Sequence, residues 1–271
     1  MKKLIATAIA SIGIAASASA SASIIGGIDF GSSGNTHIET ATLAETYING
    51  SGQSLTGYGM VSTVNGDATY CADGSANCAL YYVLHGYTSS TFTGTQVQFT
   101  GGYVDLYYSP VAAINLMNQS SPTNIGTITG MTPWLRLGGH AFVDPVFSGT
   151  QTLNGYGTLT GDTLSIFFVC QLDVVSGWGN AAVELALDTN TIGDGLGGFS
   201  DVKFTASSDN TVLNQHDAIA SCTTSTPDAG AWCLQGTSNI RGKFNVPEPG
   251  SLALLGLGLA GLGFRARRKA E

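Results

Sequence analysis

Positively charged residues are scarce in this 271-residue chain, which has 10 Lys and Arg against 18 Asp and Glu. Of the acidic residues, 16 lie between residues 23 and 245 (all but Glu248 and Glu271), but only four basic residues do: Arg136, Lys203, Arg241 and Lys243. The formal net charge of this body, residues 23–245, is therefore −12. Because nucleic-acid binding needs clustered Lys and Arg, we expect no nucleic acid among the partners.

Recognised catalytic motifs are also missing. The sequence has no H-E-x-x-H, G-x-S-x-G or P-loop pattern, no C-x-x-C pair, and four histidines far apart, at His37, His85, His140 and His216. We therefore predict that the protein is not an enzyme. A secreted hydrolase whose triad assembles from residues distant in sequence is the enzymatic alternative.

Helix signals are few. The best is Asn180 to Asp188, with Asn180 as the N-cap, and a second is Val111 to Asn118, which follows Pro110. Alternating apolar and polar segments separated by glycine turns dominate instead, and Gly101-Gly102 between two such segments predicts a tight hairpin. These patterns predict an all-β fold.

The architecture that we expect is a β-sandwich or jelly-roll, a single domain over residues 23–245 with one or two short helices. The 37 glycines and the many Ser and Thr residues also fit a disordered chain. Apolar and aromatic residues recur regularly through the body, however, and favour the folded alternative.

The five cysteines fit an exported protein. Cys71 and Cys78 bracket a turn-rich loop, and Cys222 and Cys233 bracket another, so local pairing predicts one disulfide across each loop. Other pairings of five cysteines remain open. Cys170 lies in an apolar run, and we expect it to be a small buried side chain.

The stretch most like a ligand site runs from Asp188 to Gly195, where Asp188, Asn190 and Asp194 could offer oxygen ligands to calcium. It is not an EF-hand, because Phe199 stands at the twelfth position, where a glutamate is needed. The alternative is a solvated cluster of β-turns. We expect no other cofactor.

The N-terminus has the three parts of a cleavable secretion signal. Lys2 and Lys3 precede an uncharged apolar run from Leu4 to Ala16, and small residues with A-x-A spacing follow up to Ala22. The apolar run is shorter than the roughly 20 residues that a spanning helix needs, which disfavours an uncleaved anchor. We therefore predict a signal peptide over residues 1–22, with cleavage near Ser21 or Ser23.

The C-terminus, residues 246–271, also has three parts. Pro247, Glu248 and Pro249 precede an apolar segment at about residues 250–264, and basic residues fill 265–269. The apolar segment reads as a short transmembrane stretch, with the basic tail on the cytoplasmic side. Two prolines around Glu248 resist helix and strand, and would keep the motif accessible to a protease.

This order of parts resembles the PEP-CTERM sorting domain over residues 246–269. The resemblance implies processing near Pro-Glu-Pro by an exosortase-type membrane protease, in a bacterium that makes extracellular polysaccharide. It further implies that the body is held outside the cytoplasm at the inner membrane before processing, and reaches the cell surface or the extracellular space afterwards.

We therefore expect a non-catalytic surface or matrix protein, associated with exopolysaccharide or biofilm. The alternative is a carbohydrate-binding module, with calcium as a further aid, in which exposed aromatic rings stack on sugars. The candidate rings are Trp134, Trp178, Trp232 and Tyr156.

Overall fold

The structure, a computed structural model, describes residues 22–146, 149–161, 163–217, 222 and 227–245. Nearly all of the expected signal peptide and the sorting segment with Pro247, Glu248 and Pro249 lie outside these ranges. Residues 24–245 form one compact unit. Within the described ranges, no helix combines the length and the apolar character that crossing a membrane requires.

The described residues are mostly β-structure, as the sequence predicts. The strands are β1 (Ile24–Ile25), β2 (Ile28–Asp29), β3 (Asn35–Glu45), β4 (Ser54–Val64), β5 (Ala79–Phe92), β6 (Gln96–Ser109), β7 (Thr132–His140), β8 (Phe142–Val143), β9 (Thr150–Gln151), β10 (Leu153–Thr158), β11 (Ser165–Val174), β12 (Ile192–Gly193), β13 (Phe199–Ser200), β14 (Val202–Asp209) and β15 (Leu234–Lys243). The helices are α2 (Ser121–Thr129) and α3 (Ala181–Leu187).

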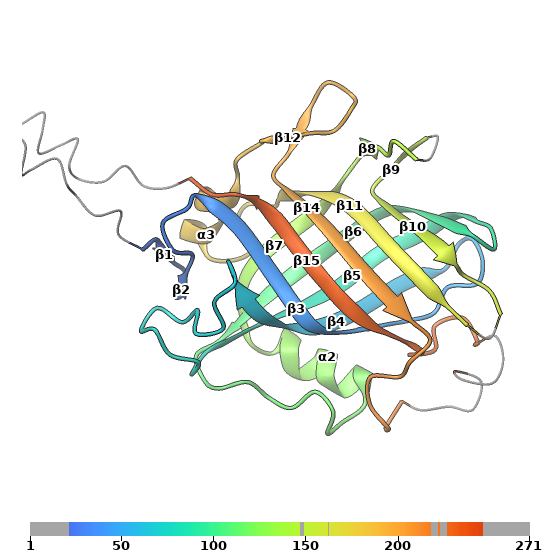
Figure 1. The fold of residues 1–271 in the computed structure, drawn as a ribbon, viewed down its shortest axis with the longest axis horizontal. Coiled ribbons are helices and arrows are strands. Elements are labelled where there is room, and N and C mark those ends of the chain that lie inside the picture. Colours follow the sequence, from blue (N-terminus) through green and yellow to red (C-terminus); the bar gives the residue numbers. More distant parts are fainter. Residues whose placement is uncertain (1–21, 147–148, 162, 218–221, 223–226, 246–271) are drawn as a thin grey trace, which may run out of the picture. The chain divides into compact units, whose positions relative to one another are not determined.

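Nine of these strands form one antiparallel sheet that closes on itself into a barrel-like wall (Figure 1). The strands pair with their neighbours in chain order, and β15 returns to pair with β3. Strands β7 and β10 both lie between β6 and β11. They pair with different stretches of these two strands. The two are therefore successive halves of one strand position, interrupted by the β8–β9 excursion.

The expected β-sandwich or jelly-roll is not confirmed. A sandwich has two packed sheets with free edges, whereas here the β15–β3 pairing joins the last long strand to the first. Closure removes the unpaired edges that would otherwise recruit other chains. Sequence alternation shows which side chains face a core, but it is the same in a sandwich and in a closed sheet, so it could not distinguish them.

Glycines on the strands make room for aromatic side chains on the neighbouring strands. A Cβ at Gly155 on β10 would lie 2.6 Å from the Phe168 ring on β11. Gly102 on β6 lies against the Tyr87 ring of β5. The hairpin expected at Gly101-Gly102 is wrong, because β6 continues through both glycines and pairs with β5 on either side of them.

Helix α3 confirms the first helix prediction, since the Asn180 side chain accepts hydrogen bonds from the backbone N–H groups of Ala182 and Val183. The second prediction is wrong. Val111–Asn118 is not helical, and the helix begins later, at Ser121 after the N-cap Ser120, with Pro122 in its first turn. Proline at that position presets the helical φ and lacks only an N–H that would have no partner.

The closed sheet has a core on each side of one wall. The main core fills the interior with buried side chains such as Leu80, Tyr82 and Leu84 of β5. A smaller core lies under α2, on the opposite face of the same strand, with Tyr81 and Val83. The disulfides Cys71–Cys78 and Cys222–Cys233 are both present, as expected, and Cys170 is free and buried.

Candidate functional site

A cluster of charged and aromatic side chains lies on the outer wall of the closed sheet, whose interior is mostly apolar. On the face formed by β5, β6, β7 and β11, strand register places four residues in one row across the strands: His85, Tyr103, Gly138 and Asp173. Asp105 and Arg136 are paired in the neighbouring row. We call this face, with His140 at its far side, the polar wall.

Asp105 is the buried centre of the polar wall, with its side chain 2% exposed. Arg136 donates from Nε to Oδ1 at 2.7 Å and from Nη2 to Oδ2 at 2.6 Å, while His85 Nε2 lies 2.9 Å from Oδ2. Burial raises the pKa of Asp105, but the hydrogen bonds and charges of Arg136 and His85 outweigh it, so that the net pKa lies below its usual value. The carboxylate is therefore ionised and both its oxygens are occupied.

The guanidinium of Arg136 also contacts two aromatic rings. Its Cζ lies 4.9 Å from the centre of the Tyr103 ring and 4.5 Å from that of Trp178. Glu184 holds the Trp178 loop in place, because its carboxylate accepts hydrogen bonds from the backbone N–H groups of residues 177–179. Arg136 and the rings thus form a fixed aromatic and cationic surface, on which Tyr103 is 39% exposed.

His140 lies between two carboxylates. Its Nδ1 is 2.6 Å from Asp173 Oδ2, and its Nε2 is 3.1 Å from Asp194 Oδ2. Burial lowers the pKa of His140, but the two carboxylates outweigh it and the net pKa is raised. With an acceptor at each ring nitrogen, the imidazolium is the favoured form. Its ion pair with Asp194 joins the β12–β13 hairpin to the polar wall.

Of the three residues expected to hold calcium, Asp188 and Asn190 are in contact, whereas the hydrogen bonds of Asp194 go to other partners. Asp188 Oδ1 accepts from Asn190 Nδ2 at 2.8 Å. Asp194 accepts from the backbone N–H groups of Leu196 and Gly198, in addition to its contact with His140. Among the described residues, no three His, Cys, Asp or Glu side chains gather in a way that could hold a metal ion.

The candidate sugar-stacking rings are in different environments. Trp134 is buried and donates from Nε1 to the carbonyl of Gly26 at 2.9 Å. Trp232 packs edge-on against Tyr58. Trp178 and Tyr156 are half-buried, and only Trp178 belongs to the polar wall. Sequence reasoning missed Tyr103, Asp105 and Arg136, because only the strand register shows that they lie together.

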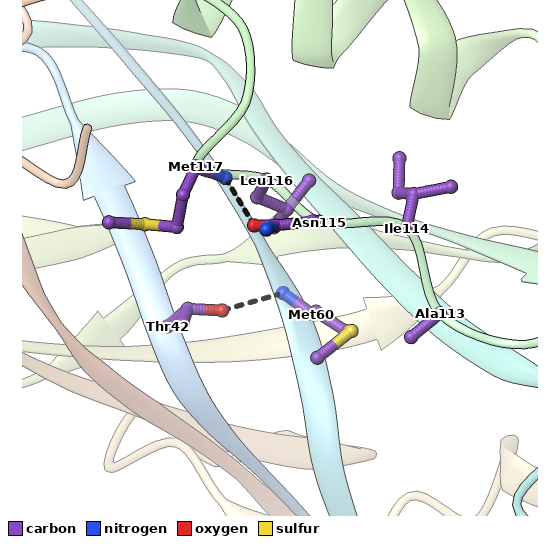
Figure 2. A pocket seen from close by; sticks show the side chains of 7 residues that line it. All are labelled: Thr42, Met60, Ala113, Ile114, Asn115, Leu116 and Met117. Carbon is purple, nitrogen blue, oxygen red and sulfur yellow. Dashed lines mark hydrogen bonds between the residues drawn. The ribbon is translucent and has the colours of Figure 1, made fainter. Parts of the chain in front are cut away.

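An apolar pocket of about 290 Å³ lies outside the polar wall, between β3, β4 and the segment 113–117 (Figure 2). Figure 2 shows the two polar contacts there, from Met60 N to Thr42 Oγ1 at 3.4 Å and from Met117 N to Asn115 Oδ1 at 2.9 Å. In both hydrogen bonds, the donor and the acceptor belong to residues that line the pocket. No charged side chain lines the pocket, so its lining offers an apolar surface and no acid, base or metal ligand.

Comparison with known protein families gives a match at the C-terminus. The PEP-CTERM protein-sorting motif matches residues 245–269, and so confirms the resemblance seen in the sequence. No curated protein and no solved structure matches the chain. The match implies an exported protein that is processed by an exosortase, held transiently at the membrane by its C-terminus and then placed at the surface.

Proposed function

We propose that the body is a non-catalytic extracellular domain, which the sorting motif delivers to the cell surface and whose polar wall binds polysaccharide there. The sorting match supports the delivery. The observation that supports polysaccharide binding is the stack of Tyr103, Arg136 and Trp178. In this stack the partly exposed Tyr103 ring is fixed beside the Arg136 guanidinium. Sugars bind to such surfaces by stacking on the ring and by hydrogen bonds to neighbouring polar groups.

The rigidity of the wall favours binding. Asp105 fixes Arg136, and Glu184 fixes the Trp178 loop, so that little side-chain freedom remains to be lost when a ligand binds. His85 contributes a side chain that is 38% exposed and Asp173 one that is 43% exposed, at either end of the row. His85 can reach the hydroxyl groups of a sugar that lies across Tyr103, whereas Asp173 Oδ1 is buried and Asp173 Oδ2 contacts His140.

The hydrogen bonds of the histidines favour a non-catalytic role. In the described ranges, the ring partners of His37, His85 and His140 are amide and carboxylate oxygens rather than a hydroxyl or thiol that could act as a nucleophile. The Ser121 hydroxyl donates to Asp217, with Tyr58 as its other neighbour. The Ser121 side chain is fully buried, so its hydroxyl is not presented to a substrate.

Binding of the purified protein to bacterial exopolysaccharides, measured by calorimetry and on a glycan array, tests the proposal. We expect binding that Tyr103→Ala and Arg136→Gln each reduce, whereas Phe167→Ala, which removes another exposed ring from β11, leaves it unchanged. Failure of the unmodified protein to bind any glycan would overturn the proposal. Turnover of a glycosidase, esterase or protease substrate that depends on a single Asp or His would favour the secreted hydrolase instead.

A role at the surface can also be tested in cells. We expect deletion of the gene to change aggregation, biofilm formation or envelope properties, and the unmodified gene to restore them. Restoration by the Tyr103→Ala variant would show that the polar wall is not needed for this role.

A further inference from the structure

Three of the four basic residues of the body lie together on one face. Lys203 of β14 is opposite Arg241 of β15, and Lys243 follows two residues later on the same side of β15. All three are exposed, and none forms an ion pair in the part of the chain that the structure describes. On a body with a net charge of −12, this is a local positive surface without internal partners.

Large apolar side chains are exposed on α3 and on the β12–β13 hairpin, which precedes Lys203 of β14 in the sequence. Phe199 is 56% exposed and Leu196 is 53% exposed, both on the β12–β13 hairpin that leads directly into β14 (Figure 1). Leu185 of α3 is 76% exposed. The Asp201 side chain joins α3 to this hairpin, because it accepts hydrogen bonds from the backbone N–H groups of Thr189 and Asn190.

We call these six residues the exit face: Leu185, Leu196, Phe199, Lys203, Arg241 and Lys243. Few free carboxylates oppose its positive charge. Asp194 and Asp201 are buried and accept hydrogen bonds from backbone N–H groups, while Asp188 is exposed. Exposed apolar groups beside unpaired basic groups are the combination that binds an anionic membrane surface.

The chain leaves the closed sheet at this face. Asn245 donates from its backbone N–H to the Ala186 carbonyl at 2.7 Å, and from Nδ2 to the Leu185 carbonyl at 3.3 Å. Only residues 246–249 separate Asn245 from Gly250, where the apolar C-terminal segment begins. A fully extended chain covers roughly 18 Å over that distance. While the segment is anchored, the exit face therefore cannot lie far from the bilayer.

We propose that the exit face rests on an anionic phospholipid surface while the C-terminal segment anchors the chain. Lys203, Arg241 and Lys243 contact the lipid phosphates, and the exposed apolar side chains enter the interface beside them. This contact would orient the unprocessed protein and hold residues 247–249 at the bilayer surface, where a membrane protease acts. It goes beyond glycan binding, since its six residues are not those proposed to bind sugar, although Lys203 lies in the same strand row as His140 of the polar wall, with Gln171 between them.

The test uses the full chain, reconstituted through its C-terminus into vesicles of phosphatidylglycerol and phosphatidylethanolamine with brominated acyl chains. Bromine quenches tryptophan fluorescence only at close range, so Phe199→Trp reports contact of the hairpin with lipid. Phe167→Trp is the matched control, because Phe167 is an exposed phenylalanine on β11 beyond the exit face. The signal of Trp134, Trp178 and Trp232, measured in the unmodified chain, is subtracted from both.

We expect quenching in Phe199→Trp and none in Phe167→Trp. Adding Lys203→Gln, Arg241→Gln and Lys243→Gln should lower the ratio of docked to undocked protein about fivefold for each charge removed. Equal quenching of the two reporters, or quenching that the three Gln substitutions leave unchanged, would overturn the proposal. So would loss of binding to an acidic polysaccharide in the triple variant without any Phe199→Trp quenching, because that result assigns the basic residues to a glycan.

Discussion

Arg136 and Asp105 face each other on neighbouring strands and share two hydrogen bonds, at 2.7 and 2.6 Å. The Arg136 side chain is 24% exposed, whereas that of Asp105 is 2% exposed. The two residues therefore differ in what stabilises their charges. The buried Asp105 carboxylate has lost its water and depends on Arg136 to compensate for that loss, whereas the Arg136 guanidinium is still partly hydrated. This difference determines which half of the pair costs more to lose.

Arg136→Gln should destabilise the protein by about 2–3 kcal/mol, because it leaves the Asp105 carboxylate buried with only His85 as a partner. Arg136→Gln combined with Asp105→Asn should cost less than Arg136→Gln alone, because the double variant buries no uncompensated charge. The free energies of unfolding from urea titrations measure this coupling. An additive double variant would mean that the two residues act independently.

Gly102 has a φ of +95° and lies against the Tyr87 ring. Gly102→Ala should therefore destabilise the fold both through backbone strain and by displacing a buried ring, by roughly 2–4 kcal/mol in total. Gly66→Ala is the matched control, since Gly66 has a φ of +83° but has no atom within 4 Å of an added Cβ. We expect the control to cost only about 1 kcal/mol. Equal melting temperatures for the two variants would show that the ring contact contributes nothing.

Local features of the fold could be predicted from the sequence, because short-range chemistry determines them. Asn180 caps α3 through its own side chain, and each cysteine pair closes a short loop with Cα atoms 5.8 Å or 5.1 Å apart. The failure at Gly101-Gly102 has a physical cause as well. Two glycines suit a tight turn, but they suit equally a strand that must bend around the Tyr87 ring.

Closure of the sheet and the polar wall could not be predicted, because both depend on register between distant strands. Pairing of β15 with β3 joins Lys243 to Asn35 across most of the chain. Tyr103, Arg136 and Trp178 meet only once β6, β7 and the loop before α3 are in place. No spacing in a single segment carries that information.

Calcium should not raise the melting temperature of the protein. Asp194, one of the three residues of the expected site, already accepts two backbone hydrogen bonds and contacts His140, so binding an ion would break existing interactions. Thermal unfolding with calcium and with a chelator tests this prediction, and calorimetric titration gives an independent reading. A rise in melting temperature that Asp188→Asn or Asp194→Asn removes would restore calcium to the loop.

The stability of the protein should fall as pH rises from about 4.5 to 7, and Glu45 should be a main cause. Glu45 is 1% exposed, its Oε2 accepts a 2.5 Å hydrogen bond from Ser208, and its Oε1 has no partner among the described residues. Burial raises its pKa from 4.5 to about 7, although the Ser208 hydrogen bond opposes the rise. The folded protein therefore holds a proton that the unfolded chain releases, and each pH unit between the two pKa values destabilises the fold.

Glu45→Gln should abolish the part of the pH dependence of stability that comes from Glu45. Glutamine cannot ionise, and its amide oxygen can still accept from Ser208 Oγ. Over the whole interval this part is on the order of 3 kcal/mol, so the variant should gain stability relative to the unmodified protein as pH rises and reach a constant difference above pH 7. Urea unfolding of both proteins across the range measures it. His140, whose raised pKa also makes stability fall as pH rises, titrates in both proteins and cancels in the comparison. Parallel pH profiles would mean that Glu45 keeps an ordinary pKa, and that water or a structural change reaches its unpartnered oxygen.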